Sequence, residues 1–437
     1  MRPRRSADRS EVDRHYTTYL IVIAVAGLAL VSYDYNLLVL AIPDIARQLD
    51  LSQSRIGSLI FFISAAQLVV TLAVGYTLDV VGRRRMWMLC LCAAAAFTGL
   101  TYFVQNFWQL VVVRMLASSF AQAEFVVSIT IVNEELSAKR RGMLYSIVQS
   151  GWPVGVLLAS AVYLLFSHRG WRFIFLLGIV PMILVTVGRY FIRESDRFRH
   201  LEQVRAAQRA GNGARVKRLL KRYDVDVDAL RGTTVKQLFA HAGPVRRQLV
   251  LLSAIWMAFG ASIAATNFFI TDFLTRVKGF TAHQAATLLL VSAGVGILFY
   301  WLGGWLGERR GRRQVLIVTA LLVPPLNLLF LLVHDHAMVL AVYFLIYQVT
   351  NGTWSGAGYA YQAESFPTRV RGTAVGFLGA AFAGGILLGS GVWTLLMVVS
   401  TPTMAWLVVA VGAAFGQWLT LFARRIPPGM RLEEIAT

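Results

Sequence analysis

Long apolar runs, separated by short polar segments, follow one another along the chain. Twelve of these runs are long enough to cross a membrane as helices, since a transmembrane helix needs about 20 mainly apolar residues. They cover residues 17–46, 55–79, 86–104, 108–133, 142–166, 171–192, 249–275, 283–307, 314–334, 337–362, 372–399 and 402–423. The pattern predicts an all-α polytopic membrane protein with twelve transmembrane helices.

The longest polar segment lies between the sixth and seventh runs. Residues 193–248 mix charged side chains with apolar ones such as Leu219 and Leu230, a mixture typical of short amphipathic helices at a membrane surface. We therefore expect five regions: an N-terminal tail (1–16), an N-terminal six-helix bundle (17–192), a central loop (193–248), a C-terminal six-helix bundle (249–423) and a C-terminal tail (424–437).

A motif of glycines, one acid and two arginines occurs twice, between apolar runs. The first copy has Gly75, Asp79, Gly82, Arg83 and Arg84, and the second, 229 positions later, has Gly304, Glu308, Gly311, Arg312 and Arg313. Another pair recurs at nearly the same offset, Glu135 with Arg141 and Glu364 with Arg371. We interpret both copies as charged tight turns, and the chain as one six-helix unit written twice.

The distribution of charge indicates which way the chain crosses the membrane. Only 15% of the residues are charged, against about a quarter in soluble proteins, yet the net charge is +20. The tails and even-numbered loops hold 35 of the 42 Lys and Arg residues, and the odd-numbered loops hold six. By the positive-inside rule, we expect both termini to be cytoplasmic, and we expect the protein to lie in the cell inner membrane. The basic segments are expected to meet anionic lipid head groups rather than nucleic acid.

Three charged residues lie well inside the apolar runs of the N-terminal half, away from the ends of the runs: Asp34, Arg114 and Glu124. A charge at the centre of a membrane helix costs about 2.5–3.5 kcal/mol, so it should face the bundle interior and have a partner. At about 1.5 Å per residue, Arg114 lies about 9 Å and Asp34 about 13 Å from the same membrane face. These depths predict contact, either as a permanent structural ion pair or as a proton-coupling site. Glu124 lies deeper, as a second proton site or a structural acid.

The C-terminal half offers uncharged polar side chains instead. We expect four of them to bind substrate together with Arg114: Asn267, Gln348, Asn351 and Tyr359. One half then supplies titratable groups and the other supplies hydrogen bonds and aromatic surface. This division suits a binding site between two repeats.

Motifs for other kinds of chemistry are missing from the sequence. There is no phosphate-binding glycine-lysine loop, no Gly-x-Ser-x-Gly motif and no paired metal-ligand motif. The two cysteines, Cys90 and Cys92, fall in one apolar run, and all seven histidines lie in tails, loops or span ends. We expect neither an enzyme nor a bound cofactor or metal.

The repeated Gly-x-x-x-Asp/Glu-x-x-Gly-Arg-Arg motif, the twelve runs and the long central loop resemble the major facilitator superfamily. The resemblance implies two six-helix bundles that rock about a central site, with the repeated motifs gating the cytoplasmic side. Residues 34–46 and the spacing of ten between Arg114 and Glu124 resemble the proton symporters of lactate, sialate and aromatic acids, and more distantly the sugar porters. In one departure from that pattern, Val31 stands where these symporters often have a second acid.

These features lead to one functional hypothesis, proton-coupled symport of a small organic anion by a monomer. Asp34 takes a proton and releases Arg114, which attracts a substrate carboxylate. Two alternatives stay open: a sugar, polyol or drug transporter of the same fold, or a membrane sensor that transports nothing and signals through the central loop.

Overall fold

The structure, a computed structural model, describes residues 5–81, 83–135, 141–189, 244–366 and 368–426, and a few isolated positions between 203 and 216. Within these ranges each of the twelve predicted runs is helical. The amphipathic helices predicted for the central loop lie almost wholly outside the described residues, and Pro244 already begins the next helix.

The helices of the first half are α1 (Arg5–Gln48), α2 (Gln53–Val81), α3 (Arg83–Leu100), α4 (Phe107–Glu135), α5 (Arg141–Gln149), α6 (Gly151–Phe166), α7 (Trp171–Leu177) and α8 (Ile179–Arg189). Those of the second half are α12 (Pro244–Ile263), α13 (Ile270–Arg276), α14 (Ala282–Leu306), α15 (Arg312–Leu332), α16 (His336–Tyr347), α17 (Ser355–Glu364), α18 (Thr368–Val399), α19 (Pro402–Trp406) and α20 (Ala413–Phe415), which continues as a tighter helix over Gly416–Phe422.

Several spans are divided where the regular backbone hydrogen bonding changes. Proline has no backbone N–H to donate to the carbonyl oxygen four residues earlier. Pro153 therefore leaves the carbonyl of Gln149 without its helical hydrogen bond, which accounts for the break between α5 and α6. Pro181 does the same to Leu177 and accounts for the break between α7 and α8. Three spans of the second half instead widen into π-helical turns, over Ala264–Phe268, Gln348–Trp354 and Leu407–Gly412. Such turns are rare and occur often at functional sites.

Helix α1 begins at Arg5 and so extends through most of the predicted tail, because no proline or glycine lies between Arg5 and Thr17. One sequence-based expectation about local structure is wrong. The first glycine-arginine motif is not a turn from residue 75 onward, since α2 runs to Val81 and α3 begins at Arg83. In the second copy α14 ends at Leu306, and the wide turn Gly307–Gly311 leads into α15.

The surface of the bundle is suited to hydrocarbon. Among the described residues, nine segments are long and apolar enough to cross a membrane, and one of them, Ala282–Leu332, includes both α14 and α15. Large apolar side chains such as Val69, Leu165 and Leu395 are two-thirds exposed. The chain is therefore a multi-pass membrane protein.

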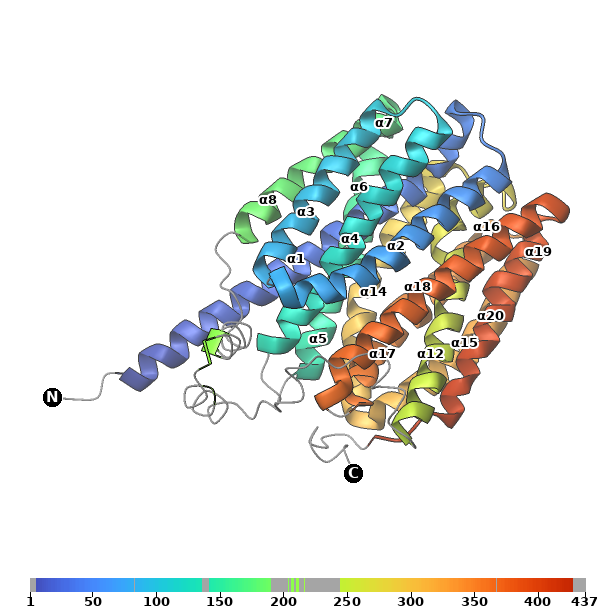
Figure 1. Ribbon diagram of the computed structural model, residues 1–437. Coiled ribbons are helices and arrows are strands. Elements are labelled where there is room, and N and C mark those ends of the chain that lie inside the picture. The colour runs from blue at the N-terminus through green and yellow to red at the C-terminus, as the bar shows by residue number, and fades with distance from the viewer. Residues whose placement is uncertain are drawn as a thin grey trace.

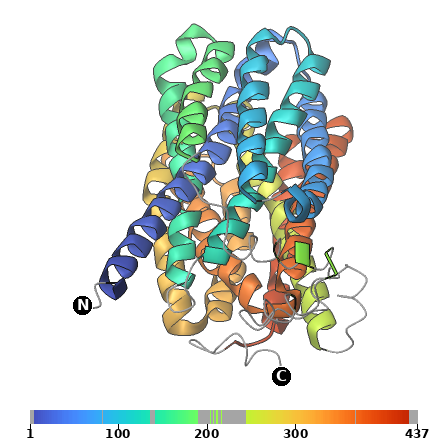
Figure 2. The same ribbon diagram turned by 60° about the vertical axis from the view of Figure 1, so that its left-hand side comes forward.

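Two bundles lie side by side, α1–α8 in one and α12–α20 in the other (Figures 1 and 2). Within the bundles α1 packs on α6, and α12 packs on α18. Between the bundles α2 packs on α18, and α6 packs on α14. Each contact has a counterpart in the other half, as a twofold repeat requires.

The start of α1 and the end of the last helix lie at the same end of the molecule (Figures 1 and 2). We name this the terminal end and the opposite one the far end. At the far end, side chains of the preceding loops cap the helices of the second half: Thr281 with Gln284 forms a capping box for α14, and Asp335 caps α16.

Candidate functional site

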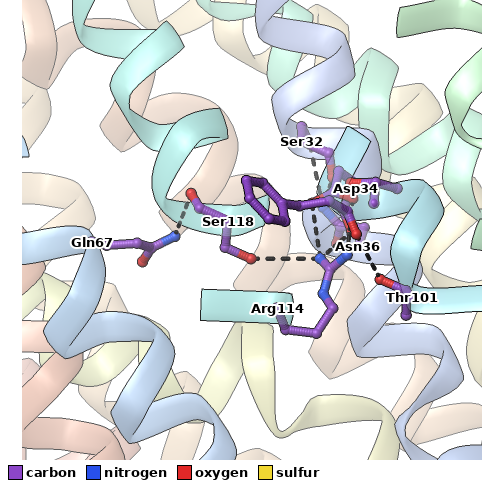
Figure 3. A network of polar contacts seen from close by, with 9 residues as sticks. Ser32, Asp34, Asn36, Gln67, Thr101, Arg114 and Ser118 are labelled. Atoms are coloured by element: carbon purple, nitrogen blue, oxygen red, sulfur yellow. Dashed lines mark hydrogen bonds and ion pairs between the residues drawn. The ribbon is translucent and has the colours of Figure 1, made fainter. Parts of the chain in front are cut away.

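Helices α1 and α4 bring Asp34 and Arg114 together inside the first bundle (Figure 3). The Nη2 atom of Arg114 donates to Oδ2 of Asp34 at 2.8 Å, and Nη1 donates to Oδ1 at 3.1 Å. The side chains are 1% exposed for Asp34 and 0% for Arg114. The contact predicted from their depths is confirmed, as a two-point ion pair removed from solvent.

Side chains from three helices surround this ion pair. Thr98 of α3 donates its hydroxyl to Oδ1 of Asp34 at 2.5 Å. The guanidinium carbon of Arg114 lies 4.9 Å from the ring centroid of Phe175 in α7, a cation–π contact, and Nη2 lies 3.5 Å from the Ser118 hydroxyl. Within the described residues, the Nε–H of Arg114 has no hydrogen-bond acceptor. The arginine therefore keeps one donor free while all its contacts stay in the first bundle.

Glu124, the third charged residue, lies apart from the pair. It is fully buried and accepts a hydrogen bond from Nε1 of Trp87 at 2.9 Å. In the part of the chain that the structure describes, no hydrogen bond or ion pair joins Glu124 to Asp34 or Arg114. The role of Glu124 as a second proton site or a structural acid stays a prediction.

Another face of α1 contacts the second bundle. The ring of Tyr35 lies 5.8 Å from that of Trp152 in α6 and 4.2 Å from that of Phe268, at the end of a wide turn. Towards the far end, the Thr271 hydroxyl of α13 donates to the carbonyl oxygen of Val39 at 2.5 Å. Helix α1 thus connects the buried ion pair directly to the contact between the two halves.

The wide turns of the second bundle bring two of the predicted amides together. Asn267 donates to Asn351 at 2.8 Å, and Asn351 donates back at 3.1 Å. Gln348 donates to the carbonyl oxygen of Ser292 at 2.9 Å. Its own Oε1 and the Tyr347 hydroxyl are buried without a hydrogen-bond partner among the described residues. A bound molecule could form hydrogen bonds with the Gln348 oxygen and the Tyr347 hydroxyl.

Not all the predicted substrate-binding residues meet. Tyr359 packs its ring on Trp256 of α12, with centroids 4.9 Å apart, and makes no described contact with the Asn267–Asn351 pair. Arg114 likewise has no described contact with the second bundle. The sequence-based set therefore divides into an ion pair in one bundle and an amide pair in the other.

The second copy of the repeated motif joins elements at the terminal end. Nε of Arg312 lies 2.7 Å from Oε2 of Glu364, which ties the start of α15 to the end of α17. A Cβ at Gly304 would lie 2.5 Å from the Ser146 hydroxyl of the first bundle, so this glycine permits close approach of the two halves. Gly311 has φ +92°, a conformation that glycine adopts readily.

Other members of the motif have different positions. Arg313 donates to the carbonyl oxygen of Leu421 at 2.6 Å, and Glu308 is exposed. In the first copy Arg84 is half-buried, near the start of α3. The remaining predicted gate residues lie outside the described residues or have side chains that do: Gly75, Asp79, Gly82, Arg83, Glu135, Arg141 and Arg371. Their role in gating stays a prediction.

A protein-family model and several relatives of known name match this chain over most of its length. The model of the Major Facilitator Superfamily matches residues 24–323 and 250–436. A cis,cis-muconate transport protein of Acinetobacter baylyi is 25% identical over 396 residues, covering 86% of this chain and 88% of that protein. A gallate transporter of Pseudomonas putida is 22% identical, covering 69% and 68%.

A solved structure has the same fold. It is that of the proton:xylose symporter XylE of E. coli bound to 6-bromo-6-deoxy-D-glucose. The TM-score is 0.71 at 18% sequence identity, and the match covers 97% of this chain and 99% of that one. The twelve-helix architecture predicted from the sequence is confirmed.

Proposed function

Because this chain belongs to the major facilitator superfamily, we propose that it is a secondary active transporter that couples movement of a small organic anion to protons by alternating access. The buried Asp34–Arg114 ion pair carries the proposal, since an ionisable pair deep in a membrane bundle marks a proton or ion pathway. The names of the muconate and gallate relatives denote carboxylates, which favours a carboxylate as the substrate here.

The ion pair couples proton movement to anion movement by keeping the net charge of the bundle interior at zero. When a proton binds a carboxylate oxygen of Asp34, the hydrogen bonds from Arg114 lose their anionic acceptor. The guanidinium then carries an uncompensated positive charge in a low-dielectric interior and attracts the substrate anion. With proton and anion both bound, the interior is again neutral, so the bundles can rock to the other side. Loss of the proton re-forms the pair and favours release of the anion.

The substrate site in this proposal lies between the bundles, near Tyr35 and the Asn267–Asn351 pair. The two amides satisfy each other in the present conformation, and either N–H group can turn to a carboxylate when the pair opens. Arg114 acts on the anion through its charge, because its described contacts all belong to the first bundle.

The orientation in the membrane follows from the loops. With the terminal end in the cytoplasm, the 35 basic residues of the tails and even-numbered loops face the cytoplasm, and six face outward. We also propose that the protein is a monomer of the cell inner membrane, with its basic segments against anionic lipid head groups.

Proton coupling can be tested in liposomes that contain the purified protein and a pH-sensitive dye. Cis,cis-muconate, gallate and xylose are added outside in turn, and internal pH and tracer uptake are followed together. We expect one of the two acids to cause protein-dependent acidification that Asp34→Asn abolishes. Asp44→Asn is the matched control, because Asp44 lies on the same helix near the far end and pairs with Arg47.

Each other outcome would identify a different function. Acidification with xylose alone would identify a sugar symporter, and tracer uptake without acidification would make the protein a uniporter or exchanger with Asp34 as a structural acid. Binding without any uptake would favour a sensor. Protein-free liposomes correct for acids that cross the bilayer unaided.

A further inference from the structure

The hydroxyl of Thr98 lies directly against the acid of the ion pair. It donates to Oδ1 of Asp34 at 2.5 Å, and both side chains are buried, with Thr98 0% exposed. Thr98 belongs to α3, whereas Asp34 belongs to α1 and Arg114 to α4. The carboxylate is therefore held by two donors from separate helices, one charged and one neutral.

The two donors respond differently to a proton on Asp34. Oδ1 accepts from both Thr98 and Arg114, while Oδ2 accepts from Arg114 alone. Hydrogen bonds donated to a carboxylate favour its ionised form. Arg114 has no role as an acceptor, but a threonine hydroxyl can rotate and accept the proton of a neutral acid. Thr98 can keep a bond to the neutral acid, but a weaker one, because a hydrogen bond to an ionised carboxylate is about twice as strong as one between neutral groups. Its net effect is therefore to favour the ionised form of Asp34.

We infer that Thr98 is a positioning residue that sets the proton affinity of Asp34, and with it the pH at which the Asp34–Arg114 pair opens. The inference rests on the proton coupling proposed above. Among the described residues, Arg114 is the charged group that contacts Asp34, and the titratable side chains next to Asp34 on α1 are Tyr33 and Tyr35. Titratable groups on the other helices around α1 have partners of their own: Glu124 with Trp87, Tyr163 with Asp44, Arg172 with Gln48 and Asp272 with Arg276.

The test measures protonation of Asp34 without a substrate. Infrared difference spectra of the purified full-length protein in lipid nanodiscs are recorded across pH, and the carboxylic-acid band that disappears in Asp34→Asn is assigned to Asp34. In Thr98→Val, which keeps the shape but removes the donor, we expect the midpoint of this band to move up by about one to two pH units. Thr98→Ser should return it close to the original value.

A matched control lies one turn away on the same run. The Thr101 hydroxyl is also buried but donates to the backbone oxygen of Phe97, so Thr101→Val should leave the midpoint unchanged. Thr98→Ala provides a second variant if Thr98→Val does not fold. If the midpoint of the Asp34 band in Thr98→Val and Thr98→Ala is the same as in the unmodified protein, the proposed role of Thr98 is wrong, while the proton coupling at Asp34 still stands. If Asp34→Asn removes no titrating band, the proposed proton coupling is wrong and this inference fails with it.

Discussion

Gly155 of α6 lies directly against the backbone of Ala29 in α1, where a Cβ on the glycine would come within 2.1 Å of the Ala29 carbonyl oxygen. The second bundle repeats this approach. A Cβ at Gly385 of α18 would lie 2.0 Å from the carbonyl oxygen of Met257 in α12. The two glycines are 230 positions apart, as are Arg141 and Arg371 of the recurring Glu-and-Arg pair. The sequence repeat is therefore also a repeat of close helix packing.

Gly385→Ala should destabilise the second bundle, because the added methyl group meets backbone that cannot move independently. Overpacking of this kind costs about 1–3 kcal/mol. The neighbouring Gly384 is the matched control, since a Cβ there meets nothing within 4 Å and alanine is the better helix former. Thermal unfolding of the purified protein should show a lower Tm for Gly385→Ala and an unchanged or higher one for Gly384→Ala. Equal Tm values would mean that α18 can shift away from α12 at little cost.

Thr271→Val should weaken the connection between the bundles at the far end, because it removes the hydrogen bond to Val39. We expect the far end to open more often. Spin labels at the exposed positions Gln105 and Ser400, one in each half, would report longer distances in a background without Cys90 and Cys92. Thr275→Val is the control, because the Thr275 hydroxyl bonds within its own segment. An unchanged distance distribution would mean that other contacts alone keep this end closed.

The sequence predicted the features that depend on hydropathy and charge. Apolar runs of spanning length gave the twelve helices, and the depths of Asp34 and Arg114 in their helices gave the ion pair. These predictions succeed because a membrane leaves few places for a charge. Asn267 and Asn351 could also be selected from the sequence, since they are polar residues in apolar runs, but their mutual hydrogen bonds were not predicted.

The rotation of each helix about its axis could not be predicted in the same way. Thr98 and Phe175 reach the ion pair because of how α3 and α7 are turned, and a single threonine or phenylalanine in an apolar run carries no signal of its partner. The same applies to Tyr359, which packs on Trp256. The wide turns at Ala264–Phe268 and Gln348–Trp354 depend on packing as well, and the length of an apolar run does not reveal them.

Asn267→Asp should impair transport of an anion more than Asn267→Ala does. The alanine variant removes one side of the amide pair, whereas the aspartate adds a negative charge beside Asn351 that repels a carboxylate. We expect KM to rise at least tenfold for the aspartate variant, equivalent to about 1.4 kcal/mol. Asn327→Asp is the matched control, because Asn327 is buried in α15 and donates within its own helix. If a neutral substrate is transported, Asn267→Asp should have a much smaller effect on its KM.

Arg114→Leu should destabilise the protein more than the double change Asp34→Asn with Arg114→Leu. Removing one partner of a buried ion pair costs about 3–5 kcal/mol, because the other charge stays buried without compensation. The double variant leaves a neutral amide that Thr98 can still bond, so its Tm should lie above that of Arg114→Leu. Lowering the pH should recover part of the loss in the single variant, since a protonated Asp34 needs no counter-ion, and should have little effect on the double variant. Additive losses that do not depend on pH would falsify this account: Asp34 and Arg114 would then stabilise the bundle independently, and the free energy of their pairing could not contribute to transport.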